Sequence, residues 1–276
     1  MITELNTRDF YKCKSLINEK GNLEVKAVIE GINPGRIFVD NNDSPKTGLI
    51  WLGNNDGFFF IGNEENKIFN NNIIDFIDKT IVPEAKKLQV NYFIGIGNHQ
   101  RWDKTIEKLF EHRQMKMSNQ KVYELQKANY KEKFNPTIDQ EYKVLKINKV
   151  LYENNDQSLE NIEFLRSKIL EFWTSPESFF NKGIGYCIAY NNKIVSVCFS
   201  GFVVENMHAI DIETIEAYQG NKLAQKIAHY VVNDCISNGM VPYWDCMETN
   251  KPSNAIAQNM GFTNVFNYVV YMFPLE

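Results

Sequence analysis

The chain has 276 residues, a net charge of −4, a hydrophobic fraction of 43% and a charged fraction of 23%. This length suits two domains of about 100–150 residues each, and the composition is that of an ordinary globular protein. The acidic balance, with a pI near 5.7, provides no broad positive field, so we expect no nucleic acid as a main partner.

Neither a secretory signal nor a membrane anchor is expected. Met1-Ile2-Thr3-Glu4 lacks a charged region followed by an apolar core. The longest apolar run, Ile194–Val204, is too short and too interrupted to span a bilayer. The five cysteines are an odd number without CxxC spacing, which predicts reduced, mostly buried thiols in a cytoplasmic protein. No His/Cys/Asp cluster has metal-ligand spacing, so we expect no metal.

The first elements follow the order strand, strand, strand, helix, strand, helix. Arg36–Asp40 and Leu49–Leu52 are short apolar runs around a turn-rich segment, which indicates a β-hairpin, and Phe58–Ile61 is a third strand. Isoleucines at helical spacing over residues 73–81 predict a helix. A strand at Tyr92–Ile96 and a helix around residues 102–110 follow.

A polar segment at residues 129–141 separates two halves of the chain. It contains Pro136, and proline and the residue before it resist helix formation. We therefore expect a linker between an N-terminal α/β domain at residues 1–135 and a second domain at residues 140–276. The order of elements in the first half resembles an abbreviated copy of the middle of the second, which suggests an internal repeat of the fold.

The second half predicts a largely antiparallel sheet with helices on its faces, an α+β (mixed α/β) fold. The predicted elements are Tyr142–Tyr152 (strand), Leu159–Trp173 (helix), Glu177–Asn181 (helical turn), Gly185–Tyr190, Ile194–Val203 and His208–Ile215 (strands), Asn221–Ser237 (helix), Val241–Met247 (strand), Pro252–Met260 (helix), and Phe262–Phe266 and Tyr268–Phe273 (strands).

The turn between the strand ending at Ile215 and the helix starting at Asn221 is suited to bind an anion. Gly220 lies in this turn and the helix begins at once, which leaves backbone N–H groups at the positive end of a helix. A charge-assisted hydrogen bond contributes about 1.5–3 kcal/mol, so a few of them together could hold a pyrophosphate. Lys222 would add a positive charge.

These residues resemble a known motif. Gln219-Gly220-Asn221-Lys222-Leu223-Ala224 is similar to the Q/R-x-x-G-x-G/A sequence with which GNAT (GCN5-related) N-acetyltransferases bind the pyrophosphate of acetyl-CoA. Asn250-Lys251-Pro252-Ser253 and Asn259-Met260-Gly261-Phe262 resemble the asparagine, helix and terminal Gly-Phe signature of that family. The order of elements from Tyr142 to Phe273 also matches the family. The resemblance implies a GNAT fold in the C-terminal half.

One branch of the family is closer still. Asp211-Ile212-Glu213-Thr214 together with Pro242-Tyr243-Trp244-Asp245-Cys246 resembles the zwittermicin A resistance-like acetyltransferases. In that branch an extra N-terminal domain precedes the GNAT half. This implies that the first half of the present chain is such a domain, and we expect it to be a degenerate GNAT-like repeat.

The resemblance implies acetyl-CoA as the co-substrate. Its pantetheine arm would pair with the backbone of the strand before Ile215, like an added strand. The implied CoA-binding residues are Ile212, Thr214, Gln219, Gly220, Asn221, Lys222, Leu223, Ala224, Asn250 and Ser253. Two positions depart from the family pattern. Lys222 replaces the central glycine of the motif, and Ala257 stands where many members have a tyrosine that protonates the departing thiolate.

Two carboxylates near this strand end are the candidate catalytic groups. Strand alternation puts Asp211 and Glu213 on one face, opposite Ile212 and its apolar neighbours. Amine acylation needs a proton acceptor, and we predict Glu213 first, then Asp211, then Glu216. Alternatively, Asp211 and Glu213 bind a cationic substrate without taking its proton.

Other conspicuous side chains are expected to be structural. Tyr243 and Trp244 are predicted to be core aromatics, Cys246 a buried and inert thiol, and His208 and His229 structural or solvated histidines.

The leading hypothesis is therefore an acetyl-CoA-dependent N-acetyltransferase acting on a small-molecule amine, with amino-containing antibiotics among the candidate acceptors. A second hypothesis is a non-catalytic acyl-CoA-binding sensor, in which Lys222 and Ala257 mark lost catalysis. A third is an interaction scaffold, but it leaves the Gln219–Ala224 turn unexplained. The sequence gives neither the acceptor nor the oligomeric state.

Overall fold

The computed structural model describes residues 1–18, 20–53 and 57–275. Packing divides the chain into two compact units, unit 1 (Met1–Gln120 with Asn267–Glu276) and unit 2 (Lys121–Phe266). Residues 121–135, which the sequence groups with the first half, therefore pack in unit 2. The last ten residues return to unit 1. The functional division into residues 1–135 and 140–276 stays a prediction.

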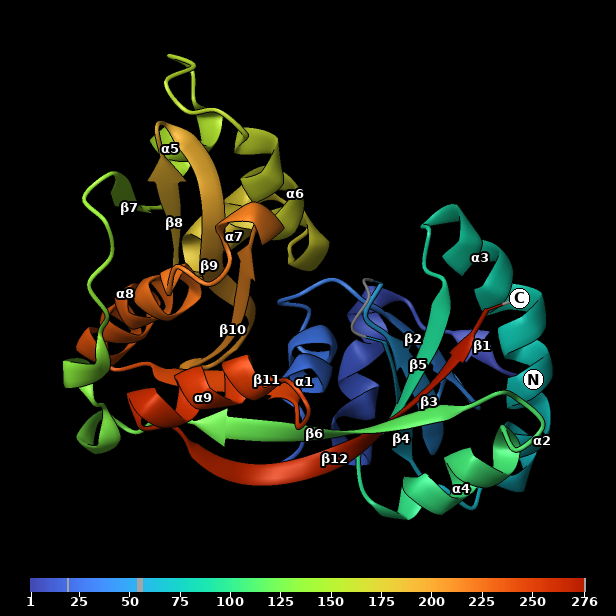
Figure 1. Cartoon of the computed structure of the whole chain (residues 1–276). Coiled ribbons are helices and arrows are strands. Elements are labelled where there is room, and N and C mark those ends of the chain that lie inside the picture. The colour runs from blue at the N-terminus through green and yellow to red at the C-terminus, as the bar shows by residue number, and fades with distance from the viewer. Residues whose placement is uncertain (19, 54–56, 276) are drawn as a thin grey trace. The chain divides into compact units, whose positions relative to one another are not determined.

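Unit 1 contains a mixed sheet with the strand order β1-β2-β3-β4-β5-β12 (Figure 1). The pairs β2–β3 and β3–β4 are antiparallel, whereas β4 and β5 run parallel. The predicted hairpin, third strand and fourth strand are confirmed. The strands are β1 (Thr3–Glu4), β2 (Arg36–Val39), β3 (Thr47–Trp51), β4 (Phe58–Gly62), β5 (Tyr92–Gly97) and the last part of β12 (Thr263–Pro274).

The helices of unit 1 cover an aromatic core that includes the stacked rings of Phe58 and Phe93. The two predicted helices are confirmed, and the first continues through a π-helical turn. The 3₁₀ helix and α1 lie outside the predicted elements. The helices are a 3₁₀ helix (Thr7–Leu16), α1 (Leu23–Ile29), α2 (Lys67–Phe76), the π-helical turn (Ile77–Ile81), α3 (Val82–Lys87) and α4 (Arg101–Leu109).

The strands of unit 2 follow the order β12-β6-β11-β10-β9-β8-β7. The strands from β7 to β10 pair antiparallel, and β10 pairs parallel with β11. β6 lies outside the predicted elements, and its first five residues belong to unit 1. The strands are the last part of β6 (Lys116–Glu124), β7 (Tyr142–Lys146), β8 (Gly185–Tyr190), β9 (Lys193–Val204), β10 (Met207–Thr214), β11 (Val241–Met247) and the first part of β12.

Helices cover both faces of this sheet (Figure 1). α8 packs on one face, where Ile227 and Val231 contact the cluster around Cys198. α6 and α7 pack on the other, where Phe172 and Phe179 contact Phe199 edge-on. The helices are α5 (Lys149–Glu153), α6 (Ile162–Phe172), α7 (Pro176–Lys182), α8 (Leu223–Ser237) and α9 (Lys251–Met260).

Two predictions for this half, the strand at its start and the pair of strands at its end, are wrong in part. The strand expected at Tyr142–Tyr152 ends at Lys146, and α5 follows because the side chain of Asn148 accepts a hydrogen bond from the N–H of Leu151 at 2.9 Å and caps the helix. The two expected closing strands are one long strand, β12, since no turn interrupts the described residues from Thr263 to Pro274.

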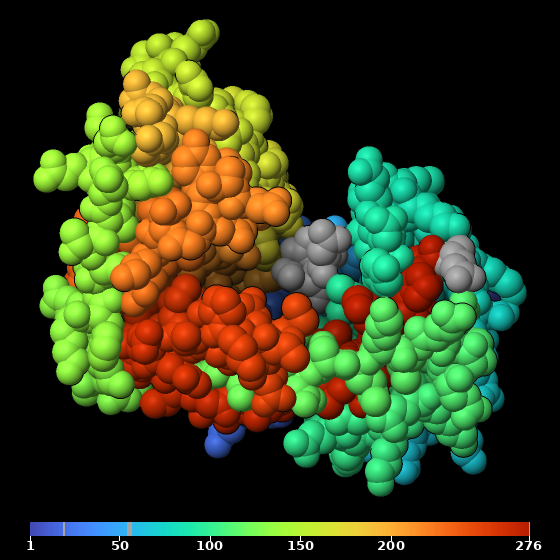
Figure 2. Space-filling view, viewed as in Figure 1, coloured from blue at the N-terminus to red at the C-terminus, as the bar shows by residue number. Residues whose placement is uncertain are grey.

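The expected linker lies against unit 2. Residues 127–134 contain two short 3₁₀ turns. The N–H of Lys131 donates to the carbonyl of Met260 at 2.9 Å, and the side-chain amide of Gln225 donates to the carbonyl of Phe134 at 2.8 Å. In Figure 2 this segment is the light-green band beside α8 and α9. It is therefore a packed part of unit 2.

The buried side chains agree with the structural expectations. Tyr243, Trp244 and all five cysteines are buried, and the cysteines are reduced. Burial raises the pKa of the Cys246 thiol, which makes it less reactive. In the described part of the chain, no helix has the length and apolar character that crossing a membrane requires.

His208 and His229 are buried in unit 2. Their Nδ1 atoms lie 2.9 Å from the hydroxyls of Ser200 and Tyr130, respectively. Burial lowers the pKa of each imidazole to about 4. In the unfolded chain a histidine has a pKa of about 6.5. Folding therefore favours the neutral form, and its contribution to stability is present above pH 6.5 and is lost as the pH falls toward 4.

We expect each histidine to remove about 2 kcal/mol of stability between pH 7.5 and pH 5, because the unfolded chain takes up the proton first. Urea denaturation of the wild-type protein and of the His208→Gln and His229→Gln variants measures this. Each variant should lose less stability over this range than the wild-type protein. Parallel pH profiles for all three would show that the histidines do not cause the acid sensitivity.

Candidate functional site

Strands β10 and β11 pair over only part of their length. Within the described residues, the parallel pairing joins Met207–Ala209 to Val241–Tyr243 and ends there, although β10 continues to Thr214. The register of β10 against β9 shifts between Ala209 and Ile210. Such a bulge bends a strand and increases its local twist. Beyond the bulge, β10 keeps its pairing with β9 while its other edge leaves β11.

The two faces of β10 have different surroundings, as the strand alternation predicts. Ile212 packs toward the apolar clusters beneath α8 and α9. Asp211 and Glu213 face α6 instead. Asp211 lies near Phe172 of α6, because a Cβ placed on Gly201 would be 3.6 Å from the Cβ of Asp211 and 3.1 Å from the ring of Phe172. Glu213 contacts Lys168, which is also on α6. Both candidate carboxylates therefore lie on one face of the sheet.

Glu213 is held by a lysine that the sequence does not single out. The ammonium of Lys168 on α6 lies 2.6 Å from Oε2 of Glu213 and 3.1 Å from Oε1 of Glu171. Burial lowers the pKa of Lys168, but hydrogen bonds to Glu213 and Glu171 outweigh it, so the pKa lies above its ordinary value. Lys168 is a surface-type residue of an amphipathic helix, so only the packing of α6 on the sheet identifies this contact.

The turn after β10 contains two residues with a left-handed backbone. Residues Glu216–Tyr218 form a 3₁₀ turn, and Gly220 and Lys222 both have positive φ values, 82° and 60°. α8 begins at Leu223, two residues later than predicted, with Lys222 at the N-cap position. Among the described residues, the Lys222 side chain makes no capping hydrogen bond. The backbone N–H groups that open a helix of 15 residues are thus placed for an anion.

The conformation of Lys222 explains why its position is usually a glycine. A left-handed backbone costs a residue with a Cβ roughly 1–2 kcal/mol, whereas glycine adopts it freely. Lys222 adopts this backbone nevertheless, with φ 60° and ψ 16°, and its side chain is exposed. The departure from the motif therefore keeps the shape of the turn.

Side chains within the turn bind their own backbone. The amide of Gln219 donates to the carbonyl of Thr214 at 3.1 Å, and the amide of Asn221 donates to the carbonyl of Tyr218 at 3.1 Å. The hydroxyls of Thr214 and Ser196 lie 2.8 Å apart. These contacts fix the turn to the ends of β9 and β10. Glu216, the third candidate base, is exposed in the 3₁₀ turn.

The remaining predicted CoA residues lie at the start of α9, where they have structural contacts. The side chain of Asn250 accepts a hydrogen bond from the N–H of Ser253 at 3.2 Å and caps the helix. The hydroxyl of Ser253 accepts a hydrogen bond from the indole of Trp244 at 3.0 Å. Ala257 is fully buried among apolar side chains. Binding of CoA by Asn250 and Ser253 stays a prediction.

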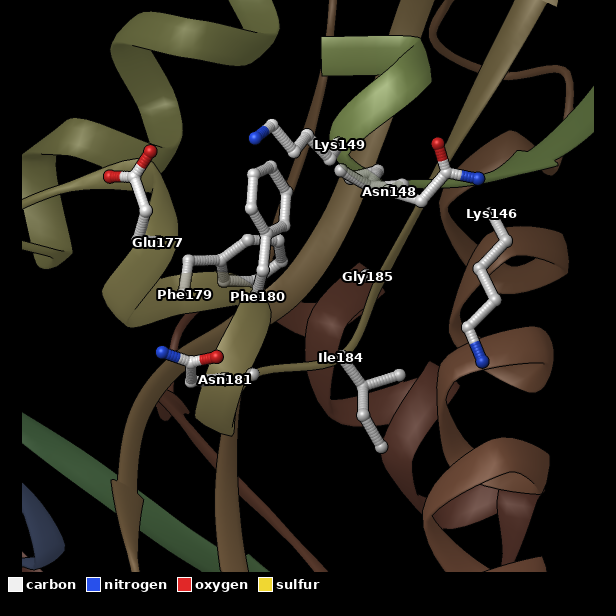
Figure 3. A pocket seen from close by; sticks show the side chains of 11 residues that line it. Lys146, Asn148, Lys149, Glu177, Phe179, Phe180, Asn181, Ile184 and Gly185 are labelled. Atoms are coloured by element: carbon white, nitrogen blue, oxygen red, sulfur yellow. The ribbon is translucent and has the colours of Figure 1, made fainter.

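A pocket of about 490 Å³ lies elsewhere in unit 2, beside β7 and α7 (Figure 3). Phe179 and Phe180 contribute apolar side chains to its lining, and Glu177 and Lys149 contribute charged ones. Lys146 points away from it in Figure 3 and pairs with Asp234 at 2.6 Å. None of the predicted site residues lines this pocket.

Among residues 1–18, 20–53 and 57–275, no group of three or more His, Cys, Asp or Glu side chains could hold a metal ion.

In this mixed α/β unit, β10 parts from β11 after Ala209 and leads through a glycine turn into the start of α8. Residues 14–271 match the GNAT acetyltransferase family, and the chain belongs to that family. The match covers nearly the whole chain, beyond the C-terminal half that the motifs occupy.

Individual relatives support the same fold. The chain is 25% identical over 276 residues to the uncharacterized N-acetyltransferase YdfB of Bacillus subtilis, with 98% of each chain covered. Its fold is similar to that of a GCN5-related N-acetyltransferase-like protein from Streptococcus suis, with a TM-score of 0.71, 19% identity and coverage of 96% of this chain and 98% of that one. A GCN5-related N-acetyltransferase from Sphaerobacter thermophilus has a similar fold, with a TM-score of 0.61 and 9% sequence identity. The similarity covers 100% of this chain and 96% of that one. The predicted mixed α/β GNAT fold is confirmed.

Proposed function

We propose that this protein is an acetyl-CoA-dependent N-acetyltransferase that acylates the amine of a small molecule. The observation that carries the proposal is the course of β10. Among the described residues, β11 pairs with β10 from Met207 to Ala209 and then diverges from it, and β10 leads directly into the turn at Gly220 and the start of α8. This provides backbone groups for an extended amide chain and N–H groups for a diphosphate in one continuous segment.

The proposed binding mode follows from that segment. The backbone of Ile212 and Thr214 pairs with the pantetheine arm, and the N–H groups from Gly220 to Ala224 bind the pyrophosphate, with Lys222 adding a charge. Asn250 and Ser253 contribute from the start of α9. An N–H of β10 beside the bulge donates to the thioester carbonyl and stabilises the negative charge that develops on its oxygen.

The proposed chemistry is one nucleophilic substitution at that carbonyl. The neutral amine forms the new C–N bond, the C–S bond breaks, and the amine proton passes to Glu213, with Asp211 as the second candidate. The leaving thiolate takes a proton from water or another group, because Ala257 offers none. A carboxylate on β10 is within one or two residues of the backbone that would hold the thioester, which is the proximity that general-base catalysis needs.

We also propose that the protein belongs to the zwittermicin A resistance-like branch and that its acceptor is an amino-containing small molecule of the antibiotic type. The Asp211–Thr214 and Pro242–Cys246 segments support this. In the structure these segments occupy β10 and β11, the two strands that part beside the proposed thioester position.

The proposal is tested by calorimetric titration with CoA and by a thiol-release assay with acetyl-CoA and a panel of small amines. We expect CoA to bind with a Kd in the micromolar range, since a few charge-assisted hydrogen bonds of about 1.5–3 kcal/mol each are available. At least one amine should release the thiol. Binding without thiol release for any amine would favour the sensor hypothesis, and the absence of binding would overturn the proposal.

A further inference from the structure

The contact between α6 and the end of β10 has a role that the motifs do not assign. The ammonium of Lys168 lies 2.6 Å from Oε2 of Glu213, a distance typical of a charge-assisted hydrogen bond. The side chain of Lys168 is 22% exposed and that of Glu213 is 45% exposed. Such a pair is partly shielded from water, so it restrains the carboxylate more than a fully exposed ion pair would.

The helix that carries Lys168 is itself firmly placed. Phe172, one turn further along α6, packs edge-on against Phe199 and Phe202 of β9, with ring centroids 5.7 and 5.4 Å apart. Leu165 and Ile169 on the same helix are fully buried. Lys168 therefore projects from a rigid support toward β10, and the position of its ammonium follows from packing.

In the described part of the chain, the charged neighbours of this carboxylate come from α6 and β10. From α6 these are Lys168 and, through it, Glu171. From β10 itself the neighbour on the same face is Asp211. On β9 the residues opposite Glu213 and Asp211 are Val197 and Phe199, which carry no charge. Of these residues, Lys168 is the positively charged one.

We propose that Lys168 is a positioning residue for Glu213, which fixes the direction of the carboxylate on its face of β10. This rests on the proposed function, in which Glu213 accepts the amine proton. Without the ammonium, the carboxylate is free to rotate about its side-chain bonds, so it meets the amine in the productive geometry less often and turnover falls.

The test compares kcat and the KM for acetyl-CoA at pH 7.5 for the wild-type protein and for Lys168→Met and Lys168→Arg. In Lys168→Met kcat should fall about tenfold, because a misplaced catalytic group loses the benefit of orientation. The KM for acetyl-CoA should stay unchanged. Lys168→Arg should recover most of the wild-type kcat, because a guanidinium can also donate hydrogen bonds to the carboxylate. Glu171→Gln is the matched control, since it removes another partner of Lys168 and leaves the contact with Glu213 in place.

A second readout does not depend on turnover. In protein labelled with ¹³C at the glutamate carboxyls, the Glu213 resonance is assigned by its loss in Glu213→Gln. At pH 7.5 its chemical shift should change in Lys168→Met, where the hydrogen bond from the ammonium is lost, and stay in place in Glu171→Gln. The same Glu213 chemical shift in wild-type and Lys168→Met protein would overturn the inference even if the enzyme is active. An inactive wild-type protein with the expected displacement would overturn the proposed function and leave the ion-pair effect standing.

Discussion

Replacing Glu213 by glutamine is expected to lower kcat of thiol release by about 10²–10⁴-fold, the usual contribution of a positioned general base. Glutamine keeps the size of the side chain and can still accept a hydrogen bond from Lys168, but it cannot take up the amine proton. The proposed contacts with CoA use the backbone of β10 and of the turn before α8. The Kd for CoA should therefore stay within about twofold of the wild-type value, a change of less than 0.5 kcal/mol.

Steady-state thiol release at saturating acetyl-CoA and amine measures this effect, with the CoA affinity determined by calorimetry. Glu216→Gln is the matched control, because this carboxylate is exposed in the 3₁₀ turn and the substitution is the same. Asp211→Asn separates the two candidates on the same face of β10. If turnover survives in Glu213→Gln and is lost in Asp211→Asn, the proton acceptor is Asp211. If both variants keep full turnover, neither carboxylate is the base.

The largest expected effect on stability is at Gly261, the glycine of the terminal Gly-Phe signature. It ends α9 with a φ of 99°, and a Cβ at this position would lie only 1.9 Å from the carbonyl oxygen of Asn129. Gly261→Ala must therefore displace the segment whose Lys131 N–H bonds to the carbonyl of Met260. We expect a loss of about 3 kcal/mol or more, from the left-handed backbone together with the overpacking.

Gly220→Ala provides the comparison for this prediction. Gly220 has a similar φ of 82°, but a Cβ there meets nothing within 4 Å. The expected loss is about 1 kcal/mol, from the backbone alone. Urea denaturation of the two variants at pH 7.5 separates the two causes. Equal losses would mean that residues 129–131 yield easily and that the contact with Asn129 is not a structural constraint.

Elements with a strong local pattern were predictable from the sequence. The hairpin of β2 and β3 follows from two apolar runs around a turn, and the helix start after Gly220 follows from a strand, a glycine and an apolar period. The opposite orientation of Ile212 and Glu213 follows from the two-residue repeat of a strand. In each case the residues that decide the structure lie within a few positions of one another.

Local features with weaker patterns were not predictable. The short strand β7 and helix α5 have apolar residues that fit one longer strand, and the cap at Asn148 decides between them. The segment at residues 129–136 reads as a linker because it is polar and contains a proline, yet its backbone carbonyls and N–H groups bond to α8 and α9. Hydrogen bonds of this kind depend on a partner that is distant in the sequence.

The sequence by itself therefore determined the class of fold, the glycine turn before α8 and the shared face of the two candidate carboxylates, because these depend on spacing along the chain. The tertiary structure decided where β11 leaves β10, that Lys222 can take the backbone of a glycine, and that Lys168 meets Glu213. The physical reason is that strand register and helix packing are set by the burial of whole faces. Such contacts cannot be predicted from residues that are close together in the sequence.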